Sequence, residues 1–379
     1  MGSVTVLLVL VVITALAFDF TNGFHDTANA MATSIATGAL SPRLAVAIAG
    51  VLNLTGAFLS VRVAETISSG IVDDDLISLS MIFAGLTGAI VWNVATWFLG
   101  LPSSSTHALL GGLIGAVWAG AGGSALRTGE IIGKVVVPAV VSPVMACVVA
   151  LTAIRVAHLL TRGVGGGGLV RGFRAGQIGS ASLVALAHGT NDAQKTMGVI
   201  TLALVSAGVL GQGAGPPLWV VLCAGVAISL GTCAGGWRII RTVGRRLTDI
   251  ESPQGFAAEA SSASVILVSS HLGFPLSTTQ VCTGSVLGAG LGRGRARVRW
   301  NIAGRIALSW ALTLPAAGAL GGASAWTADR GNWGVGLVVV VVLATTTCLR
   351  ILARRRPVTP DNVNEPPPRL DGPGEKKIA

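Results

Sequence analysis

Apolar runs long enough to cross a lipid bilayer recur along almost the whole chain. A helix needs about 20 mostly apolar residues to span the hydrocarbon core. Runs of roughly this kind lie near residues 3–18, 43–61, 76–99, 134–154, 217–237, 300–325 and 332–352. Shorter or interrupted runs lie near residues 26–40, 103–119, 177–211, 257–270 and 275–292. The pattern predicts an all-α polytopic membrane protein.

The charge content agrees with a membrane protein and excludes several other classes. Charged residues make up 11% of the chain, whereas soluble domains carry about 25%. This excludes a soluble enzyme, a secreted disulfide scaffold and a disordered chain. The net charge of +10 would by itself suggest a nucleic-acid partner. Its placement along the chain decides against that interpretation.

Most of the basic residues fall in segments that one side of the membrane would hold. They lie near Arg43, in 155–174, 238–246 and 293–305, and after Arg350. Cytoplasmic loops are enriched in Lys and Arg. We therefore predict an outside N-terminus and a cytoplasmic C-terminus, with attraction to anionic lipids of the inner leaflet and no nucleic-acid partner.

Two sequence motifs occur twice, in the same order. GFHDTANAM at 23–31 corresponds to GTNDAQKTM at 189–197, and LPSSSTHALLGGLIGA at 101–116 corresponds to FPLSTTQVCTGSVLGA at 274–289. Duplicated membrane units are typical of secondary transporters, which bind substrate where the units meet. The duplication predicts two inverted repeats with broken helices and re-entrant hairpins.

The repeats and their flanks give the expected division of the chain. The predicted units are a first transmembrane repeat (1–160), a Gly/Arg-rich cytoplasmic linker (161–176), a second transmembrane repeat (177–325), an additional C-terminal transmembrane helix (326–353) and a polar cytoplasmic tail (354–379).

The first motif of each repeat places charged and carboxamide side chains at membrane depth, where such groups are costly and usually functional. They are Asp19, Asn22, His25, Asp26 and Asn29 in one copy, and His188, Asn191, Asp192, Gln194 and Lys195 in the other. The paired Asp residues and nearby carboxamides suggest a cation site of oxygen ligands. A polar network that only joins helices is the alternative.

Three charged side chains each allow two interpretations. His25 is either a proton carrier or a simple hydrogen-bond donor. Lys195 is expected to pair with Asp192 or Asp26, and the alternative is direct contact with an anion. Glu259 is either a gating or proton site or an interfacial charge.

The second motif of each repeat places hydroxyl groups at a helix start. The runs are Ser103, Ser104, Ser105 and Thr106 in the first repeat, and Ser277, Thr278 and Thr279 in the second. Free backbone N–H groups and the positive end of the helix dipole favour anions at such positions. Two helix starts that meet would bind a tetrahedral oxyanion, whereas ordinary capping is the alternative.

The segments TNGFHDTANAMAT, AHGTNDAQKTMGVI, LPSSSTHALLGG and FPLSTTQVCTGSVLGA resemble the duplicated signatures of the inorganic phosphate transporter family, the low-affinity phosphate permeases. The resemblance covers roughly residues 15–325. It implies an inverted-repeat transporter, often a homodimer, that moves phosphate together with a cation. It also implies coupling-ion residues Asp26, Asn29, Asn191, Asp192 and Gln194, with phosphate at the two Ser/Thr runs.

One position departs from the sodium-coupled members, which have Asn-Asp in both motifs. Here the first copy has His25 before Asp26, and imidazole is a poor sodium ligand beside a carboxamide oxygen. His-Asp resembles bacterial members thought to use protons and neutral metal–phosphate complexes. The coupling ion, H⁺ or Na⁺, and a divalent metal travelling with phosphate are therefore left open.

These observations predict a plasma-membrane symporter for inorganic phosphate, without enzymatic activity and without a resident metal or cofactor. A sulfate or other tetrahedral-oxyanion permease of the same fold is the second hypothesis. The third is an intramembrane hydrolase that uses Asp26 and Asp192 as an acid–base pair; it would leave the Ser/Thr runs without a role.

Overall fold

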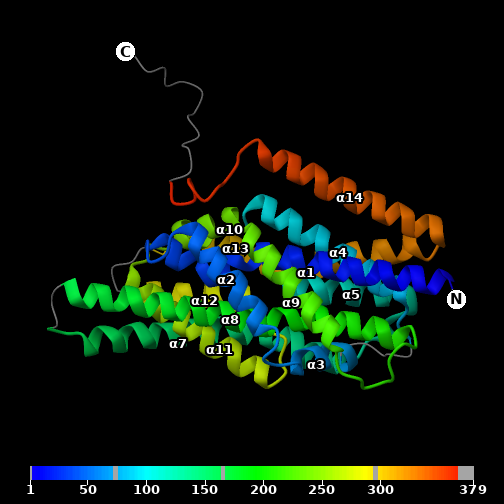
Figure 1. Cartoon of the computed structure of the whole chain (residues 1–379), viewed down its shortest axis with the longest axis horizontal. Coiled ribbons are helices and arrows are strands. Elements are labelled where there is room, and N and C mark those ends of the chain that lie inside the picture. The colour runs from blue at the N-terminus through cyan, green and yellow to red at the C-terminus, as the bar shows by residue number, and fades with distance from the viewer. Residues whose placement is uncertain (1, 71–75, 164–166, 293–297, 366–379) are drawn as a thin grey trace, which may run out of the picture.

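The computed structural model describes residues 2–70, 76–163, 167–292 and 298–365, and every regular element in these ranges is a helix (Figure 1). The helices before residue 164 are α1 (Gly2–Ala36), α2 (Pro42–Gly56), α3 (Arg62–Gly70), α4 (Leu79–Leu99), α5 (Ser105–Ala121), α6 (Thr128–Ile131) and α7 (Val137–Leu160). Those after residue 166 are α8 (Gly167–Ser206), α9 (Leu218–Ala234), α10 (Trp237–Arg241), α11 (Ser252–His271), α12 (Thr278–Gly292), α13 (Trp300–Ala328) and α14 (Asn332–Arg354). Three single-turn segments are η1 (Gly123–Ala125), η2 (Ile132–Val136) and η3 (Thr242–Arg246).

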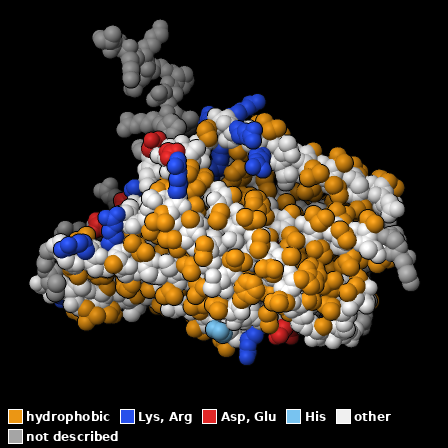
Figure 2. All heavy atoms as spheres, in the orientation of Figure 1, with side chains coloured by type: hydrophobic (Ala, Val, Ile, Leu, Met, Phe, Trp, Pro, Cys, Tyr) orange, Lys and Arg blue, Asp and Glu red, His pale blue; other side chains and the backbone are white. Residues whose placement is uncertain are grey.

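Five helices among the described residues are long and apolar enough to cross a membrane. They are Val4–Ala36, Leu79–Leu99, Thr128–Leu160, Trp300–Ala328 and Asn332–Arg354. Leu218–Ala234 and Trp237–Arg246 would form a sixth span, bent by 58°. Figure 2 shows hydrophobic side chains spread over the visible face of the bundle, with Lys and Arg side chains gathered towards its left and upper parts. These features confirm the multi-pass membrane class.

Corresponding helices of the two halves each pack on a helix of the other half. α5 packs on α13 whereas α12 packs on α7, and α1 packs on α9 whereas α8 packs on α2. In Figure 1, α1 runs from the N label at the right towards the left, and α8 runs from left to right. The two Asp-bearing helices are therefore antiparallel, which is the arrangement that inverted repeats require.

The helices that bear the two Asp motifs are continuous, and the broken helices expected from the repeats lie elsewhere. α1 has 35 residues and α8 has 40. Their polar side chains face one another inside the bundle, so the backbone needs no break to accommodate them. Breaks instead lie between α2 and α3 and at the bend that follows α9.

Most of the described part of the 161–176 segment, predicted as a linker, is helical. Helix α8 begins at Gly167, so only residues 161–163 of the 161–176 segment are described outside a helix, and 164–166 lie outside the described residues. The start of α8 is held by tertiary contacts: Arg174 donates to the Gly38 carbonyl, and Gln177 accepts a hydrogen bond from Thr37 at 2.9 Å. Of the predicted tail, 366–379 lie outside the described residues as well.

The second motif of each repeat lies at a helical hairpin. α4 packs along α5, and α11 packs along α12. Gly100 at φ +66° and Gly273 at φ +77° turn the chain after α4 and α11, and a proline follows each turn. α5 has 17 residues and α12 has 15, which is short for a full span. Both hairpins place the start of their second helix inside the bundle.

Glycine allows these short helices to approach their partners closely. A Cβ atom added at Gly115 of α5 would lie 2.0 Å from the Gly318 carbonyl oxygen of α13. A Cβ at Gly288 of α12 would lie 2.0 Å from the Cys147 carbonyl oxygen of α7. Both short helices are therefore fixed by backbone-to-backbone packing against a long helix of the other half.

Gly115→Ala is expected to destabilise the folded protein by about 1–3 kcal/mol, because the added methyl group overpacks the α5–α13 contact. Gly304→Ala in α13 is the matched control, since no atom lies within 4 Å of its added Cβ. Thermal unfolding of the detergent-purified variants measures both effects. Equal melting temperatures for the two variants would contradict the packing argument.

Candidate functional site

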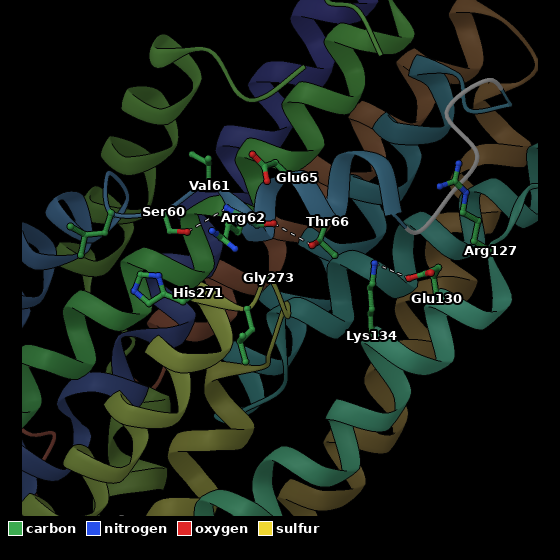
Figure 3. Close-up of a pocket in the computed structure, with 12 residues that line it drawn as sticks. Ser60, Val61, Arg62, Glu65, Thr66, Arg127, Glu130, Lys134, His271 and Gly273 are labelled. Atoms are coloured by element: carbon green, nitrogen blue, oxygen red, sulfur yellow. Dashed lines mark hydrogen bonds and ion pairs between the residues drawn. The ribbon is translucent and has the colours of Figure 1, made fainter. Parts of the chain in front are cut away.

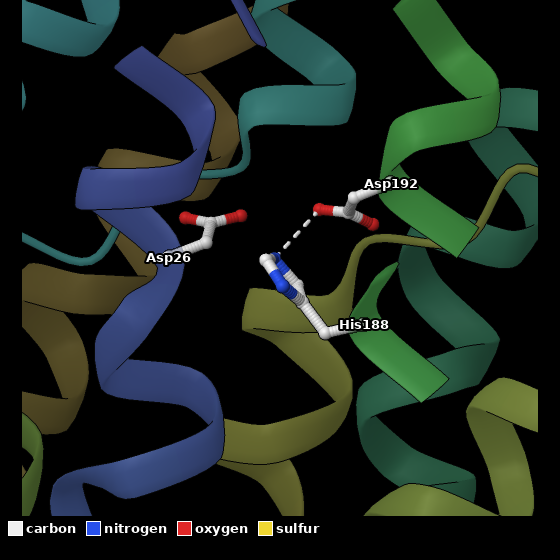
Figure 4. Close-up of side chains that lie close together, drawn as sticks. All are labelled: Asp26, His188 and Asp192. Carbon is white, nitrogen blue, oxygen red and sulfur yellow. Dashed lines mark ion pairs between the residues drawn. The ribbon is translucent and has the colours of Figure 1, made fainter. Parts of the chain in front are cut away.

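Asp26 of α1 and Asp192 of α8 lie together in the interior of the bundle. Their exposed fractions are 1% and 0%. Figure 4 shows the two carboxyl groups pointing toward one another from the two antiparallel helices, with the His188 ring close to both. One oxygen of each carboxylate and one nitrogen of His188 lie within 4.8 Å of one another. The structure thus brings together the two acidic groups that the repeat motifs single out.

Asp26 accepts hydrogen bonds from both halves of the chain. Ser105 at the start of α5 donates to Asp26 Oδ2 at 2.7 Å, and Thr279 of α12 donates to Asp26 Oδ1 at 3.2 Å. The preceding residue, His25, places Nδ1 2.6 Å from Asp26 Oδ1. The other ring nitrogen of His25 lies 3.2 Å from the hydroxyls of Thr96 and Ser103. His25 therefore links Asp26 to the α4–α5 turn.

Asp192 has a richer set of partners, including one ammonium group. Lys195 Nζ donates to Asp192 Oδ1 at 2.6 Å, and Asn191 Nδ2 donates to the same oxygen at 2.7 Å. His188 Nε2 lies 3.2 Å from Asp192 Oδ2. Lys195 has an exposed fraction of 0%. The predicted pairing of Lys195 with Asp192 is present, which offsets the cost of burying the ammonium group.

Thr278 bridges the two carboxylates. Its hydroxyl lies 3.5 Å from Asp26 Oδ2 and 3.2 Å from Asp192 Oδ2. At the same place Thr106 of α5 donates to the Leu276 carbonyl at 3.2 Å, across the two hairpins. The starts of α5 and α12 therefore meet beside the Asp pair, as the sequence predicts for an anion site.

Equivalent residues of the two repeats make equivalent contacts, but one pair of equivalent residues differs in charge. Asn29 donates to Thr279 at 3.0 Å, and Lys195 donates to Thr106 at 2.5 Å. Asn29 and Lys195 each lie three residues after the Asp of their motif. The second repeat therefore carries a buried positive charge where the first repeat carries a neutral amide.

Two of the seven predicted hydroxyl residues act as helix caps. Ser104 accepts a hydrogen bond from the His107 N–H at 3.1 Å, and Ser277 accepts one from the Gln280 N–H at 3.3 Å. Capping, the alternative interpretation, therefore describes Ser104 and Ser277, whereas the hydroxyls next to them contact the Asp pair.

Gln194, predicted as an ion ligand, contacts the start of α3. Its side-chain oxygen accepts hydrogen bonds from the Val63 and Ala64 N–H groups at 2.7 and 3.3 Å, and its amide donates to the Thr190 carbonyl. The oxygen that would hold an ion is thus occupied by the start of α3.

Glu259 lies in a second buried polar cluster. Its exposed fraction is 2%, so the carboxylate lies inside the bundle rather than on its surface. Thr33 and Ser34 donate to Glu259 Oε1 at 2.5 and 2.7 Å, and Ser180 donates to Oε2 at 2.8 Å. These partners come from α1 and α8, which are also the helices that hold the Asp pair.

His188 was named among the polar residues of the second motif copy but was given no role, and the structure places it against Asp192. The signal was available in the sequence, because positions i and i+4 share one face of a helix. His188 Nδ1 also lies 3.2 Å from Asn53 Oδ1 of α2. This second contact depends on how α2 packs on α8, which the sequence motifs do not reveal.

A charged cavity of about 810 Å³ lies at the start of α3 (Figure 3). Its lining includes Arg62, Arg127 and Lys134 together with Glu65 and Glu130. Lys134 pairs with Glu130 at 2.7 Å. The cavity is lined by the α3 start that Gln194 holds and by the 271–273 turn that leads into α12. We call this cavity the vestibule.

This apolar helical bundle buries two acidic groups between helix starts that carry hydroxyl groups. Such an arrangement defines a multi-pass membrane protein with a polar binding site. The phosphate transporter family model matches residues 22–165 and 155–321. The chain belongs to this family.

Curated relatives support the assignment over most of the chain. A probable low-affinity inorganic phosphate transporter of Mycobacterium leprae is 54% identical over 95% of this chain and 87% of its own length. One from Bacillus subtilis is 41% identical over 85% of this chain and 97% of its own length. A solved structure of a protein described as the sodium-dependent phosphate transporter has a TM-score of 0.77 at 25% identity, covering 86% of this chain and 99% of that one.

Proposed function

We propose that this protein takes up inorganic phosphate across the plasma membrane by cation symport, with alternating access at the interface of two inverted repeats. The observation that supports this most strongly is the bridging Thr278 hydroxyl, which contacts both Asp26 and Asp192 where α5 and α12 begin. Acidic groups suited to a cation and helix starts suited to an oxyanion thus share one centre.

The hydrogen bonds suggest how cation and phosphate binding are coupled. A hydroxyl group has a single proton to donate. In the structure Ser105, Thr278 and Thr279 donate to the Asp carboxylates. A cation that binds the carboxylates would replace these donors and free the hydroxyls for phosphate. The same cation would offset the repulsion between phosphate and the two acidic groups.

The remaining residues would divide between the two ligands. Asn29 and Asn191 would complete the cation site with their carboxamide oxygens, and Thr106 would contact phosphate. Lys195, already bonded to both Asp192 and Thr106, would contribute a fixed positive charge between them. Ser103, bonded to His25 and Thr96, would act through His25 rather than on phosphate itself.

Uptake of ³²P-phosphate into proteoliposomes under separately imposed sodium and proton gradients tests the proposal. We expect accumulation above equilibrium under one of the gradients. The His25–Asp26 contact favours a proton, whereas the structural neighbour is described as sodium-dependent. Absence of uptake under both gradients would contradict symport.

Sulfate remains the second candidate substrate, because hydroxyl and amide donors differ little in their preference between tetrahedral oxyanions. Competition at equal concentration decides between them: phosphate uptake should persist in the presence of sulfate. Transport is favoured over the hydrolase alternative, which would leave Ser105, Thr278 and Thr279 without a role although all three are bonded to the Asp pair. The homodimer and the orientation of the termini stay predictions.

The vestibule would gather phosphate before it reaches the centre, since basic side chains raise the local concentration of anions. Arg62→Gln is expected to raise KM for phosphate about threefold at low ionic strength, with less effect at high salt and unchanged kcat. Arg330→Gln is the control, because Arg330 stacks on Trp326 and is not part of the vestibule lining. Equal KM values for both variants would contradict this role of the vestibule.

A further inference from the structure

The two repeats differ in charge at the position three residues after each Asp. Asn29 follows Asp26 in the first repeat, and Lys195 follows Asp192 in the second. Both side chains are buried, with exposed fractions of 7% for Asn29 and 0% for Lys195. Burying an ammonium group is costly, whereas a neutral amide at this position would make the second repeat equivalent to the first. This cost indicates that Lys195 has a function that Asn29 does not have.

The Lys195 ammonium group lies between two oxygen atoms of the kinds that bind cations. Its Nζ is 2.6 Å from Asp192 Oδ1 and 2.5 Å from Thr106 Oγ1. One oxygen belongs to a carboxylate and the other to a hydroxyl, and both are ligands that hard cations take. The ammonium group therefore occupies a position that a free cation could otherwise occupy.

The first repeat has the equivalent pair of oxygens without an ammonium group. Thr279, the counterpart of Thr106 in the second motif, donates to Asp26 Oδ1 at 3.2 Å and accepts from Asn29 Nδ2 at 3.0 Å. Among the described residues, the partners of Asp26 are hydroxyl groups and the His25 ring. Asp26 thus has no permanently charged partner, whereas Asp192 has one.

We propose that the Lys195 ammonium is a tethered counter-ion in the cation position of the second repeat, and that the mobile coupling cation binds beside Asp26. Two carboxylates that face one another in a low-dielectric interior each require a positive charge. Lys195 supplies one of these charges and stays with the protein throughout the transport cycle. It therefore lowers by one the number of cations that move with each phosphate. The inference rests on the proposed symport and specifies where its cation binds.

The two carboxylates are close enough for their counter-charges to influence one another. One oxygen of Asp26 and one of Asp192 lie within 4.8 Å, and the Thr278 hydroxyl contacts both groups. A second cation at Asp192 would repel the Lys195 ammonium at short range. Conversely, loss of the Asp192 charge would release the ammonium group to pair with Asp26, where it would exclude the mobile cation.

Equilibrium binding of ²²Na⁺ to the detergent-purified full-length chain in phosphate-free buffer tests this role. We expect Lys195→Asn to bind one more sodium ion per chain than the wild type, because a carboxamide oxygen and free space replace the ammonium group. Lys195→Gln, which keeps more of the side-chain volume, should show the same gain. Lys134→Asn is the matched control, since Lys134 pairs with the half-exposed Glu130 at 2.7 Å and water can replace that contact. It should bind as much sodium as the wild type does.

The double variant Asp192→Asn/Lys195→Asn separates a cation site from a general change in packing. It contains the same substitution at position 195 but lacks the carboxylate, so it should lose the additional sodium ion. Thermal unfolding gives a second measurement, because an ion that binds only the folded protein stabilises it. Replacing choline chloride by sodium chloride at equal ionic strength should raise the melting temperature of Lys195→Asn more than that of the wild type.

Two results would overturn the proposal. One is a sodium count in both Lys195→Asn and Lys195→Gln that equals the wild-type count, with no additional stabilisation by sodium. The other is a gain that persists in the double variant, which would place the new ion away from Asp192. Because the binding assay contains no phosphate, failure of the wild type to take up phosphate contradicts the proposed function, whereas the sodium count still decides the role of Lys195.

Discussion

Asp192→Asn is expected to lower phosphate uptake by at least about 100-fold, as the loss of a buried charge partner worth about 3 kcal/mol would do. In the wild type the Lys195 ammonium lies 2.6 Å from Asp192 Oδ1. The substitution removes this counter-charge. It also weakens an acceptor of the bridging Thr278 hydroxyl. Initial ³²P-phosphate uptake into proteoliposomes, normalised to reconstituted protein, measures the effect.

Asp249→Asn provides the control for this variant. Asp249 forms an ion pair with Arg299 at 2.9 Å and has a largely exposed side chain, so its loss should change uptake less than twofold. Thermal unfolding of both variants separates a transport defect from a folding defect. Normal uptake by folded Asp192→Asn would remove the Asp pair from the mechanism.

Thr278→Val should reduce uptake about 10- to 100-fold, because hydrogen bonds to charged groups contribute about 1.5–3 kcal/mol. Valine keeps the shape of threonine but cannot donate to Asp26 or Asp192. Thr278→Ser, which restores a hydroxyl, should recover most of the activity. Measurement of KM and kcat for phosphate in each variant shows whether binding or turnover is lost.

Thr283→Val in the same helix is the matched control for the hydroxyl. Thr283 is buried in α12, and no hydrogen-bond partner contacts its hydroxyl among the described residues. It should retain uptake close to that of the wild type. If Thr283→Val and Thr278→Val lose activity equally, the effect belongs to packing of α12 rather than to the bridge between the carboxylates.

The apolar runs were sufficient to predict the membrane class, and the duplicated motifs were sufficient to predict that Asp26 and Asp192 share one site. Both follow from the residue pattern itself, since apolar runs must span the bilayer and buried charges must meet a partner. The Lys195–Asp192 contact was predictable for the same reason, because the two residues lie three apart on one helix. Local periodicity and the cost of burial determine these features.

The assignment of neighbouring hydroxyls could not be predicted, because it depends on the register of each helix start. Successive residues of a helix point about 100° apart. Ser104 therefore caps its own helix while Ser105 contacts Asp26. The contact of Gln194 could not be predicted for a related reason: its partner is the start of α3, more than 100 residues earlier in the chain.

The starting residue of α8 could not be predicted from the local sequence either. The Gly-rich segment before it favours a loop, yet α8 begins at Gly167. Contacts of Arg174 and Gln177 with the end of α1, and of Ser180 with Glu259, hold this helix in place. Tertiary packing thus outweighs the low helix propensity of glycine at this position.

We propose that one buried site binds phosphate and its coupling cation together. Equilibrium binding of ³²P-phosphate to the purified chain, measured as sodium concentration and pH are varied separately, tests it most directly. The account predicts that one cation tightens phosphate binding at least about tenfold in the wild type, equivalent to about 1.4 kcal/mol of coupling, and that Asp192→Asn loses this dependence. Phosphate binding that is independent of both cations, or a cation dependence that Asp192→Asn retains in full, would contradict it.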